Sequence, residues 1–590
     1  MLRQLWLLSA LLAGLFAAPA RATESGSNLE RDVMAAELAR RGYRIDPAPQ
    51  GKVITEIECV RYEVFDERDP IPDLFNVFHT TSRDRTIRRE LLFAEGESWN
   101  QERIDESARN LKALHQLSLV LIVPVREPDE GRVRVLVITK DVWSLRLNSD
   151  FEISGSRLNS LLLSPTEENL FGTHAKVAAS FSLQRGSYSV GGSLSHERLF
   201  GSRLSALVSY GLVFNRDDGE REGFYGSFSY GLPLYSVEQK WGFSTALVVR
   251  QYPGREYARS GGLALYDAEV TAEDDRIPYR YDYQRYVAEN RVTRSFGRRY
   301  KFNLSFGVEA NRQVYRLPAG ALADPRALAE FVERELPRSE TRLSPFAELD
   351  SYENRFLKTH ELETLGLTED VRLGHRVIVR AYPASRRVAS SRDLFGVFSG
   401  VSYTQALGNG VARALIVSAI EASNPEESEG RVGLSLHVAT PRLGIGRFVA
   451  DGTLQNRYRN YLNKKYEIGG GDRLRGYPTD DPTLRGDDAL VANVEFRSPG
   501  VNILSVECGV VAFYDVGGTA DRFRGIELRQ AAGAGLRFMM PEFDRMVLRG
   551  DWGFPLSPGY STLPGALFVT FEQAFSMPVL SAPSVVADAL

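Results

Sequence analysis

The sequence predicts a small α+β domain followed by a large antiparallel β-barrel that spans a membrane. Three observations favour this class: an apolar signal at the start, mixed helix and strand patterns from 52 to 142, and alternation of apolar with small or polar residues from 145 to 575. The chain has 590 residues and a net charge of −4. No basic field is present to attract nucleic acid, which is therefore not an expected partner.

Residues 1–22 have the pattern of a signal peptide. Arg3 precedes the apolar run LWLLSALLAGLFAAPA, and Ala18, Ala20 and Ala22 offer small residues for cleavage. Beyond this run, about 18 consecutive apolar residues never occur, so no membrane-spanning helix is predicted. If the mature chain crosses a membrane, it has to do so as a closed barrel. Residues 23–51 are polar with one weak helical pattern, and we expect a short exposed leader there.

Residues 52–142 change between strand and helix patterns. KVITEIECVRYEV is typical of a strand, and Ile87, Leu91 and Leu92 then have helical spacing. Asn100 is a candidate N-cap for a second helix with an apolar stripe, and two strands, SLVLIVPV and RVRVLVIT, follow it. The order β-α-α-β-β predicts an α+β domain of about 90 residues, which is long enough to fold by itself.

The segment RRELLFAEGESWNQERIDESARNLKALHQLSLVLIVPV, in this order, resembles a POTRA domain. POTRA domains are periplasmic modules that precede outer-membrane assembly barrels. The resemblance implies a periplasmic domain that binds peptides by adding a strand at a sheet edge, and that could also contact partner lipoproteins. An unrelated α+β module is the alternative.

From 145 to 575, period-two alternation replaces helical spacing. Val177, Ala179, Phe181 and Leu183 alternate with small or polar residues, and later segments repeat the pattern. An antiparallel sandwich could alternate in the same way. In an exported chain, apolar outer faces opposite serine and glycine are typical of a transmembrane barrel. At about 27 residues per strand and loop, this span predicts about 16 strands.

Two long segments within this span are expected to be surface loops. DAEVTAEDDRIPYRYDYQRY is acidic and rich in tyrosine. DPRALAEFVEREL predicts a short helix, with Asp324 as its N-cap, Pro325 in the first turn and Pro337 just beyond its end.

The sequence contains no recognisable catalytic constellation. Its seven histidines lack metal-ligand spacing, and neither His-Glu-x-x-His nor Gly-x-Ser-x-Gly occurs. Cys59 and Cys508 lie far apart, and we expect two unpaired thiols. We therefore expect neither an enzyme nor a bound metal or cofactor.

The loop IGGGDRLRGYPTDDP, residues 468–482, has three consecutive glycines directly after Ile468. Its spacing is similar to that of a phosphate-binding loop, but Tyr477 stands where the lysine should be and no helix follows. The triplet Leu-Arg-Gly also occurs twice more, so the triplet alone indicates little. The Arg485 copy has no comparable motif around it.

The strands that follow this loop give it a context. Alternation in ALVANVEFRS points Glu495 into the barrel, and in LSVECGVVAFYDVGG it points Phe513 and Asp515 inward. A later strand turns Asp551 inward as well. A charge in a shielded lumen is costly unless it is paired, so we expect Arg475 to reach these carboxylates if the loop folds back into the barrel.

Five motifs in consecutive order, GGGDRLRGY, NVEFRSP, AFYDVGG, GAGLRFMMP and LFVTFEQAF, resemble the C-terminal motifs of the BamA/TamA-type outer-membrane protein assembly superfamily, whose members combine POTRA domains with a bacterial surface antigen barrel. ENLFGT at 168–173 resembles an early barrel strand of that family, and the resemblance spans 52 to 575. It implies a latch loop in the lumen made by Arg475, Gly476 and Tyr477. The implied partners of this latch are Glu495, Phe513 and Asp515.

The last strand of the predicted barrel also resembles that family. Phe571 and Phe575 share one face of LFVTFEQAF and resemble the C-terminal recognition signal of outer-membrane barrels. The tail, residues 576–590, departs from the family pattern, as does the single POTRA-like module. The sequence leaves open whether the tail lies in the periplasm or in the lumen.

The resemblance implies an insertase or translocase of a Gram-negative outer membrane, with the POTRA domain in the periplasm. It would assemble or export polypeptides without ATP, by strand capture at the POTRA domain and templating at an open barrel seam. Expected partners are unfolded outer-membrane or secreted polypeptides and membrane lipids. The alternatives are a passive or substrate-specific outer-membrane channel and a structural surface antigen.

Overall fold

From residue 53 to 141, the N-terminal domain has the element order β-α-α-β-β that the sequence predicts.

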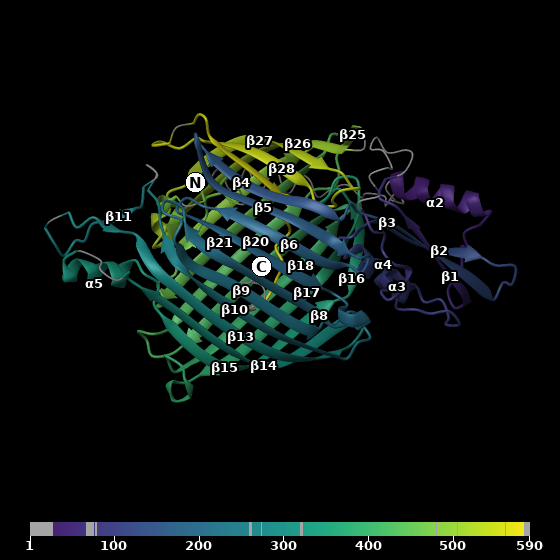
Figure 1. Cartoon of the computed structure of the whole chain (residues 1–590), viewed down its shortest axis with the longest axis horizontal. Coiled ribbons are helices and arrows are strands. Elements are labelled where there is room, and N and C mark those ends of the chain that lie inside the picture. The colour runs from purple at the N-terminus through teal and green to yellow at the C-terminus, as the bar shows by residue number, and fades with distance from the viewer. Residues whose placement is uncertain are drawn as a thin grey trace.

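This computed structural model describes residues 28–65, 76, 79–258, 262–272, 274–318, 323–471, 473–479, 481–503, 506–560 and 562–582. The predicted signal peptide lies outside these residues. Figure 1 shows the domain at one end of a large barrel. Within the described residues, no helix combines the length and apolarity needed to cross a membrane.

The N-terminal domain is a mixed sheet covered on both faces. Strands β1 (Val53–Tyr62), β2 (Leu117–Arg126) and β3 (Arg132–Asp141) lie in the order β1-β3-β2, with β1 parallel and β2 antiparallel to the central β3. Helices α3 (Asp84–Arg88) and α4 (Gln101–Lys112) connect β1 to β2. Asn100 caps α4 as expected, because its Oδ1 accepts a hydrogen bond of 3.3 Å from the backbone N–H of Arg103.

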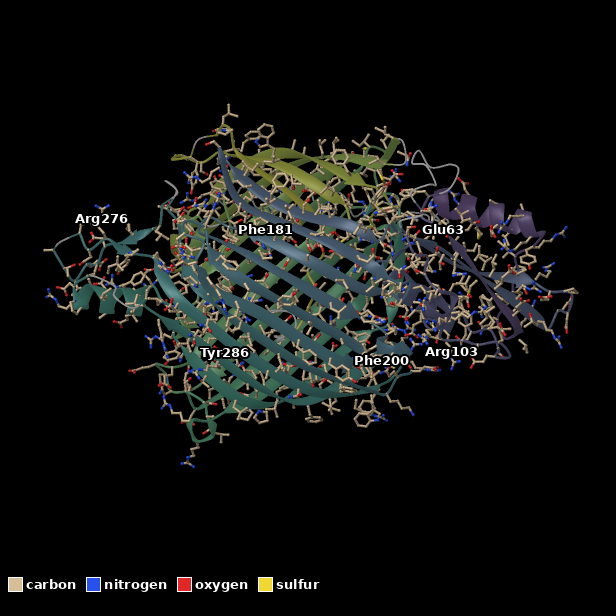
Figure 2. The ribbon with its side chains drawn as sticks, in the orientation of Figure 1. Glu63, Arg103, Phe181, Phe200, Arg276 and Tyr286 are labelled. Atoms are coloured by element: carbon tan, nitrogen blue, oxygen red, sulfur yellow. The ribbon has the colours of Figure 1, made fainter. Side chains whose placement is uncertain are left out.

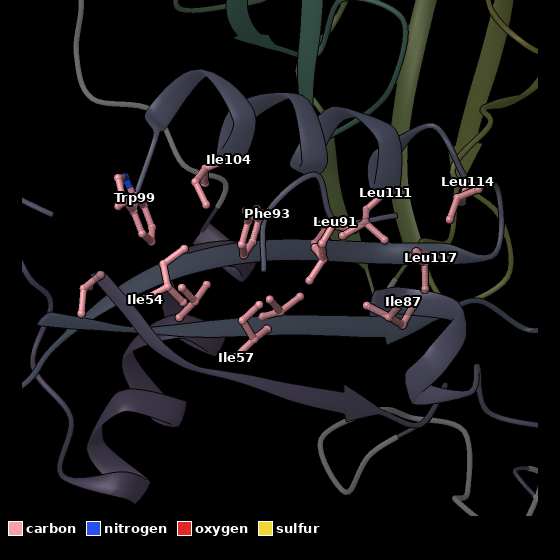
Figure 3. Close-up of a cluster of buried hydrophobic side chains, with 14 residues drawn as sticks. Ile54, Ile57, Ile87, Leu91, Phe93, Trp99, Ile104, Leu111, Leu114 and Leu117 are labelled. Carbon is pink, nitrogen blue, oxygen red and sulfur yellow. The ribbon is translucent and has the colours of Figure 1, made fainter. Parts of the chain in front are cut away.

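Two apolar clusters hold the domain together, one on each face of the sheet. On the first face, Ile87 of α3, Leu111 of α4 and Trp99, just before α4, are buried against β1 and β3 (Figure 3). On the opposite face, helix α2 (Asn28–Arg41) packs Val33 against Leu136 and neighbouring apolar residues.

The prediction of an exposed leader at 23–51 is therefore wrong for its described part. Val33 is buried, Met34 and Leu38 pack beside it, and residues 44–46 pair with the end of β2. The helix has few apolar residues. They pack on one face of the three-stranded sheet, and the sequence pattern does not show which surface they would cover.

The second unit is a closed barrel in which neighbouring strands are antiparallel and the last strand pairs with the first. Strand β16 continues β15, and β25 continues β24, because each pair contacts the same following strand. The barrel therefore has 20 strands. Its labelled segments are β4 (Leu145–Ser154), β5 (Arg157–Leu170), β6 (Ala175–Leu183), β7 (Ser187–His196), β8 (Ser205–Asn215), β9 (Arg221–Leu232), β10 (Trp241–Arg255), β13 (Arg280–Phe296), β14 (Tyr300–Arg316), β15 (Glu340–Glu353), β16 (Arg355–His360), β17 (Thr368–Ala384), β18 (Leu394–Leu407), β19 (Gly410–Ala422), β20 (Glu429–Ala439), β21 (Arg447–Asn460), β24 (Asp488–Arg497), β25 (Val501–Ile503), β26 (Val506–Ala520), β27 (Arg529–Met539), β28 (Leu548–Pro555) and β29 (Ala566–Phe571).

The prediction of about 16 strands is wrong because it assumed loops that are too long. Strands β6 and β7 are joined by three residues, and β18 and β19 by two. The 20 strands share residues 145–571, which leaves about 21 residues for each strand and its loop. Strand number depends on loop length, and alternation does not report loop length.

The barrel has an apolar outside and a charged inside. Outward side chains such as Phe306, Tyr403 and Ile416 are about half exposed, and Figure 2 shows Phe181 and Tyr286 on the barrel wall. Inward charges are buried and paired: Arg380 contacts Glu289 at 3.2 Å and Glu309 at 2.8 Å. This arrangement excludes the sandwich alternative, because a sandwich would bury its apolar faces.

A small subdomain projects from the barrel end opposite the N-terminal domain (Figure 1). It contains β11 (Leu265–Tyr266), β12 (Ile277–Pro278) and α5 (Pro325–Arg334), which pack around Phe331. The predicted cap is present, since Oδ1 of Asp324 accepts a hydrogen bond of 2.7 Å from the backbone N–H of Arg326.

Because α2 covers the sheet through Val33, we expect Val33→Asp to detach it. A buried carboxylate without a partner is strongly unfavourable, so trypsin should cleave after Arg40 and Arg41 much faster in this variant. Ala36→Asp, at an exposed position of the same helix, is the matched control and should leave the cleavage rate nearly unchanged. Equal cleavage of the two variants would contradict the packing of α2.

Candidate functional site

A long loop between β21 and β24 enters the barrel lumen. We call residues 461–487 the inner loop. It leaves the wall next to α5, where Asn463 donates to the backbone oxygens of Arg334 and Leu336. Its arms pair as β22 (Tyr466–Glu467) and β23 (Arg485–Gly486), and its apolar residues pack on the barrel wall.

Glycine allows the tip of the inner loop to lie directly on β28. Gly476 has a φ of 104°, and a Cβ there would lie 3.1 Å from the backbone of Phe554 and Pro555. A Cβ at Gly553 would lie 2.5 Å from the backbone nitrogen of Gly476. A side chain at either glycine would therefore force the loop away from the wall.

Arg475 lies at the centre of a fully buried charge cluster. Its Nε and Nη2 donate to the two oxygens of Asp515, each at 2.9 Å, and its backbone N–H donates to the same carboxylate at 3.1 Å. Nη1 contacts Glu495 at 2.6 Å and Asp551 at 3.2 Å. All four side chains have an exposed fraction of 0%. This bidentate geometry fixes the guanidinium in position as well as in charge.

Further arginines complete the cluster from the wall. Arg497 binds Glu495 through its Nε at 2.7 Å, and Arg537 contacts Asp551 at 2.5 Å. Each of the three carboxylates of the cluster therefore contacts at least one arginine. Such pairing is what permits so many ionised groups in a place without solvent.

Two aromatic rings enclose the guanidinium. Its carbon lies 3.4 Å from the centre of the Phe513 ring and 4.6 Å from that of Phe575. The contact with Phe575 corrects the prediction that this residue belongs to a terminal strand signal. Strand β29 ends at Phe571, and Phe575 is buried inside the barrel with a φ of 56°.

The other predicted loop residues have distinct contacts. Tyr477 is fully buried, its hydroxyl donates to the backbone oxygen of Gln530 at 2.8 Å, and its ring meets Tyr560 edge-on at 4.6 Å. Arg485 also has a partner, since it pairs with Glu256 near the far end of the barrel. The second Leu-Arg-Gly triplet thus anchors the base of the inner loop, a role for which its neighbours in the sequence give no signal.

The inner loop crosses the seam between the first and last strands from the inside. On the β4 side, the backbone N–H and the hydroxyl of Thr479 donate to Glu152, at 3.3 and 2.5 Å. On the other side, Gly471 packs against Phe568 of β29, and its backbone oxygen accepts from Arg549 at 3.2 Å. No local pattern indicates the contact with Glu152, which joins residues more than three hundred positions apart.

A polar junction connects the N-terminal domain to the barrel. His174, in the turn after β5, contacts Ser82 at 2.8 Å, and Ser82 donates its N–H to Asp141 at 2.6 Å. Asn169 joins the two units by donating to the backbone oxygen of Thr80 at 2.9 Å. Burial lowers the pKa of His174 to about 4, although the charge of Asp141 acts in the opposite direction.

Comparison with known proteins gives similarity to solved structures alone. No family model matches the chain, and no curated protein matches it. CdiB from Acinetobacter baumannii is 13% identical over 97% of this chain and 87% of its own, with a TM-score of 0.42. CdiB from Escherichia coli is 14% identical over 92% and 83%, with a TM-score of 0.43. BamA from Haemophilus ducreyi lacking POTRA domains 1–3 is 12% identical over 93% and 94%, with a TM-score of 0.34. TM-scores of this size are too low to transfer a function.

Arg475→Ala is expected to release the inner loop. It leaves three buried carboxylates without their shared partner, which costs on the order of 3–5 kcal/mol. Amide hydrogen exchange of 468–479 should therefore become much faster. Arg473→Ala is the control in the same loop, because the side chain of Arg473 is 44% exposed and should contribute little. Unchanged protection of the loop in Arg475→Ala would show that the cluster does not hold it.

The junction is expected to loosen in acid. The lowered pKa of His174 favours its neutral form, so its contribution is complete above about 6.5 and is lost as the pH falls toward about 4. Hydrogen exchange of residues 80–86, corrected for intrinsic rates, should rise over this range in the native chain. His174→Gln cannot gain a proton and should show a smaller rise, whereas an equal rise in both would contradict the assignment.

Proposed function

We propose that this chain is an outer-membrane barrel that inserts or exports polypeptides, with its N-terminal domain in the periplasm. One observation carries the proposal: the seam between β29 and β4 is short. It pairs residues 566–569 with 151–154, four from each strand, whereas β13 and β14 pair over fifteen. A short ladder has few backbone hydrogen bonds to break, so the seam is where this barrel can open.

The surface of the barrel supports a membrane location. Apolar side chains cover its outside and charges line its inside. Among the described residues, closure of the sheet leaves a free strand edge only near the seam. A lipid bilayer requires this inverted arrangement, because it cannot hydrogen-bond to a backbone or solvate a charge. Together with the apolar N-terminal signal, this favours the outer membrane of a Gram-negative bacterium.

The seam offers a template to an incoming strand. In the part of the chain that the structure describes, residues 145–150 of β4 pair with β5 alone. The backbone N–H and C=O groups on the edge of this segment that faces away from β5 can therefore pair with a strand from another polypeptide. Hydrogen bonds formed by that strand would replace those lost when β29 separates, so assembly needs no nucleotide, metal or other cofactor and no covalent chemistry.

The N-terminal domain is suited to capture such a strand. Strand β2 is an edge of its sheet. Within the described residues, 119–123 pair with β3 alone, while 44–46 cover the far end. Strand addition to this edge would hold an extended segment close to the barrel. The POTRA-like sequence pattern supports the same role, and the edge is also where a partner lipoprotein could bind.

The contents of the lumen argue against a passive channel. The inner loop enters from one end, and residues after β29 enter the lumen and reach Arg475 and the inner wall of β17–β19. A structural antigen, in turn, would gain nothing from a short seam. Both alternatives are therefore weaker than polypeptide handling.

A reversible lock on the seam tests the proposal. Ile153 and Leu567 are register partners across the seam, so Ile153→Cys with Leu567→Cys should form a disulfide there, in a chain whose Cys59 and Cys508 are changed to serine. In proteoliposomes, oxidation should stop the folding of a urea-denatured eight-stranded outer-membrane barrel, followed as its heat-modifiable gel shift. Reduction should restore it.

The control lock lies away from the seam. Val292 and Phe306 are register partners on β13 and β14, and Val292→Cys with Phe306→Cys should leave client folding unchanged when oxidised. Protease protection of an added secreted polypeptide inside the vesicles distinguishes export from insertion. If the seam-locked barrel assembles and exports these probes at the rate of the reduced one, the proposed mechanism is wrong.

A further inference from the structure

The chain turns away from the barrel wall after β29 and enters the lumen. Glu572 and Phe575 have φ values of 88° and 56°, and these left-handed residues redirect the backbone inward. We call residues 572–582 the lumenal tail. Ala574, Phe575 and Leu580 within it are buried.

Groups of the barrel hold the backbone of the lumenal tail. Arg497 donates to the oxygen of Ala574 at 2.7 Å, and Arg413 donates to that of Pro578 at 3.1 Å. The N–H of Met577 donates to Glu363, in the loop after β16, at 3.1 Å. These contacts recognise main-chain atoms, which every extended polypeptide provides.

One side chain of the tail occupies an apolar niche. Leu580 is 2% exposed and packs against Ile378, Phe398 and Leu415, the inward residues of β17, β18 and β19. Gly400 provides the space, because a Cβ there would lie 2.3 Å from a methyl carbon of Leu580. The adjacent Val579 is 68% exposed, and Ala582 packs at the edge of the same cluster, so Leu580 is the fully buried anchor of this niche.

This niche is an apolar site in a lumen that also contains buried, paired charges. Covering water-exposed apolar side chains with an aliphatic group is favourable. Three neighbouring strands each contribute one such apolar side chain to the niche. The side chains that bind main-chain atoms and the adjacent aliphatic niche are the two parts of a peptide-binding site. The first part binds any sequence, and the second selects an aliphatic residue. The tail shows how such a site is filled.

We propose that the lumen wall at β17–β19 is a binding site for an extended polypeptide with an aliphatic anchor residue. The lumenal tail is its resident occupant, and a polypeptide client in the barrel replaces it. The identity of this second occupant rests on the proposed function, whereas the site itself does not.

Binding in trans tests the site. A chain that ends at Phe575 keeps its contact with Arg475 but lacks the occupant, and its folding is checked by the heat-modifiable gel shift. A fluorescent peptide of sequence SMPVLSAPSVVADAL should bind it saturably and should not bind the full chain at the same concentration. The peptide with Leu580→Asp should bind at least tenfold more weakly, while Val579→Asp, the matched control, should bind within about twofold.

A protein variant and a client complete the experiment. Gly400→Leu in the truncated chain fills the niche and should weaken peptide binding at least tenfold. Peptide that binds without saturation, or equally well with Leu580→Asp, overturns the site even if client folding proceeds. Release of bound peptide by the urea-denatured barrel supports a client as second occupant, and retention of the peptide at saturating client overturns that part alone.

Discussion

The buried pairing of Arg475 with Asp515, Glu495 and Asp551 is the constraint on which the rest of the lumen depends. It joins one residue of a loop to carboxylates on three strands, β24, β26 and β28. Burying these charges is itself costly, so the cluster contributes little net stability compared with an apolar core. Its main effect is to position the inner loop, because the bidentate contact holds Arg475 at one place on the barrel wall.

That location couples the charge cluster to the seam. With Arg475 fixed, Thr479 reaches Glu152 on β4, and Gly471 lies against Phe568 on β29. The seam is thus held by a short ladder of backbone hydrogen bonds in the wall and by the inner loop on the lumen side. Phe575 extends the same coupling to the tail, since its ring covers the guanidinium. Movement of the tail, the loop and the seam should therefore be linked.

The inner-face residues were predictable from the sequence because their signal is local and periodic. Alternation placed Glu495, Phe513 and Asp515 on the inner face, and the structure brings all three to Arg475. Prediction failed where the answer depends on distant contacts. The strand count was wrong because alternation does not report loop lengths. The packing of α2 was missed because most of its apolar partners lie on β2 and β3, about a hundred residues away in the sequence. Phe575 was placed on a strand that ends four residues earlier. The pairing of Thr479 with Glu152 had no signal in either segment.

The central claim is that a client strand pairs with the free part of β4, and photocrosslinking tests it most directly. A photoreactive benzoylphenylalanine can replace Leu147, which is 58% exposed and lies on the part of β4 that pairs with β5 alone. The same group at Phe306 of β14, 57% exposed, is the control. During folding of the urea-denatured barrel in proteoliposomes, crosslinks to the client should form from position 147 and be absent from position 306. Equal crosslinking from both positions, or none from 147 while the client folds, would contradict the account.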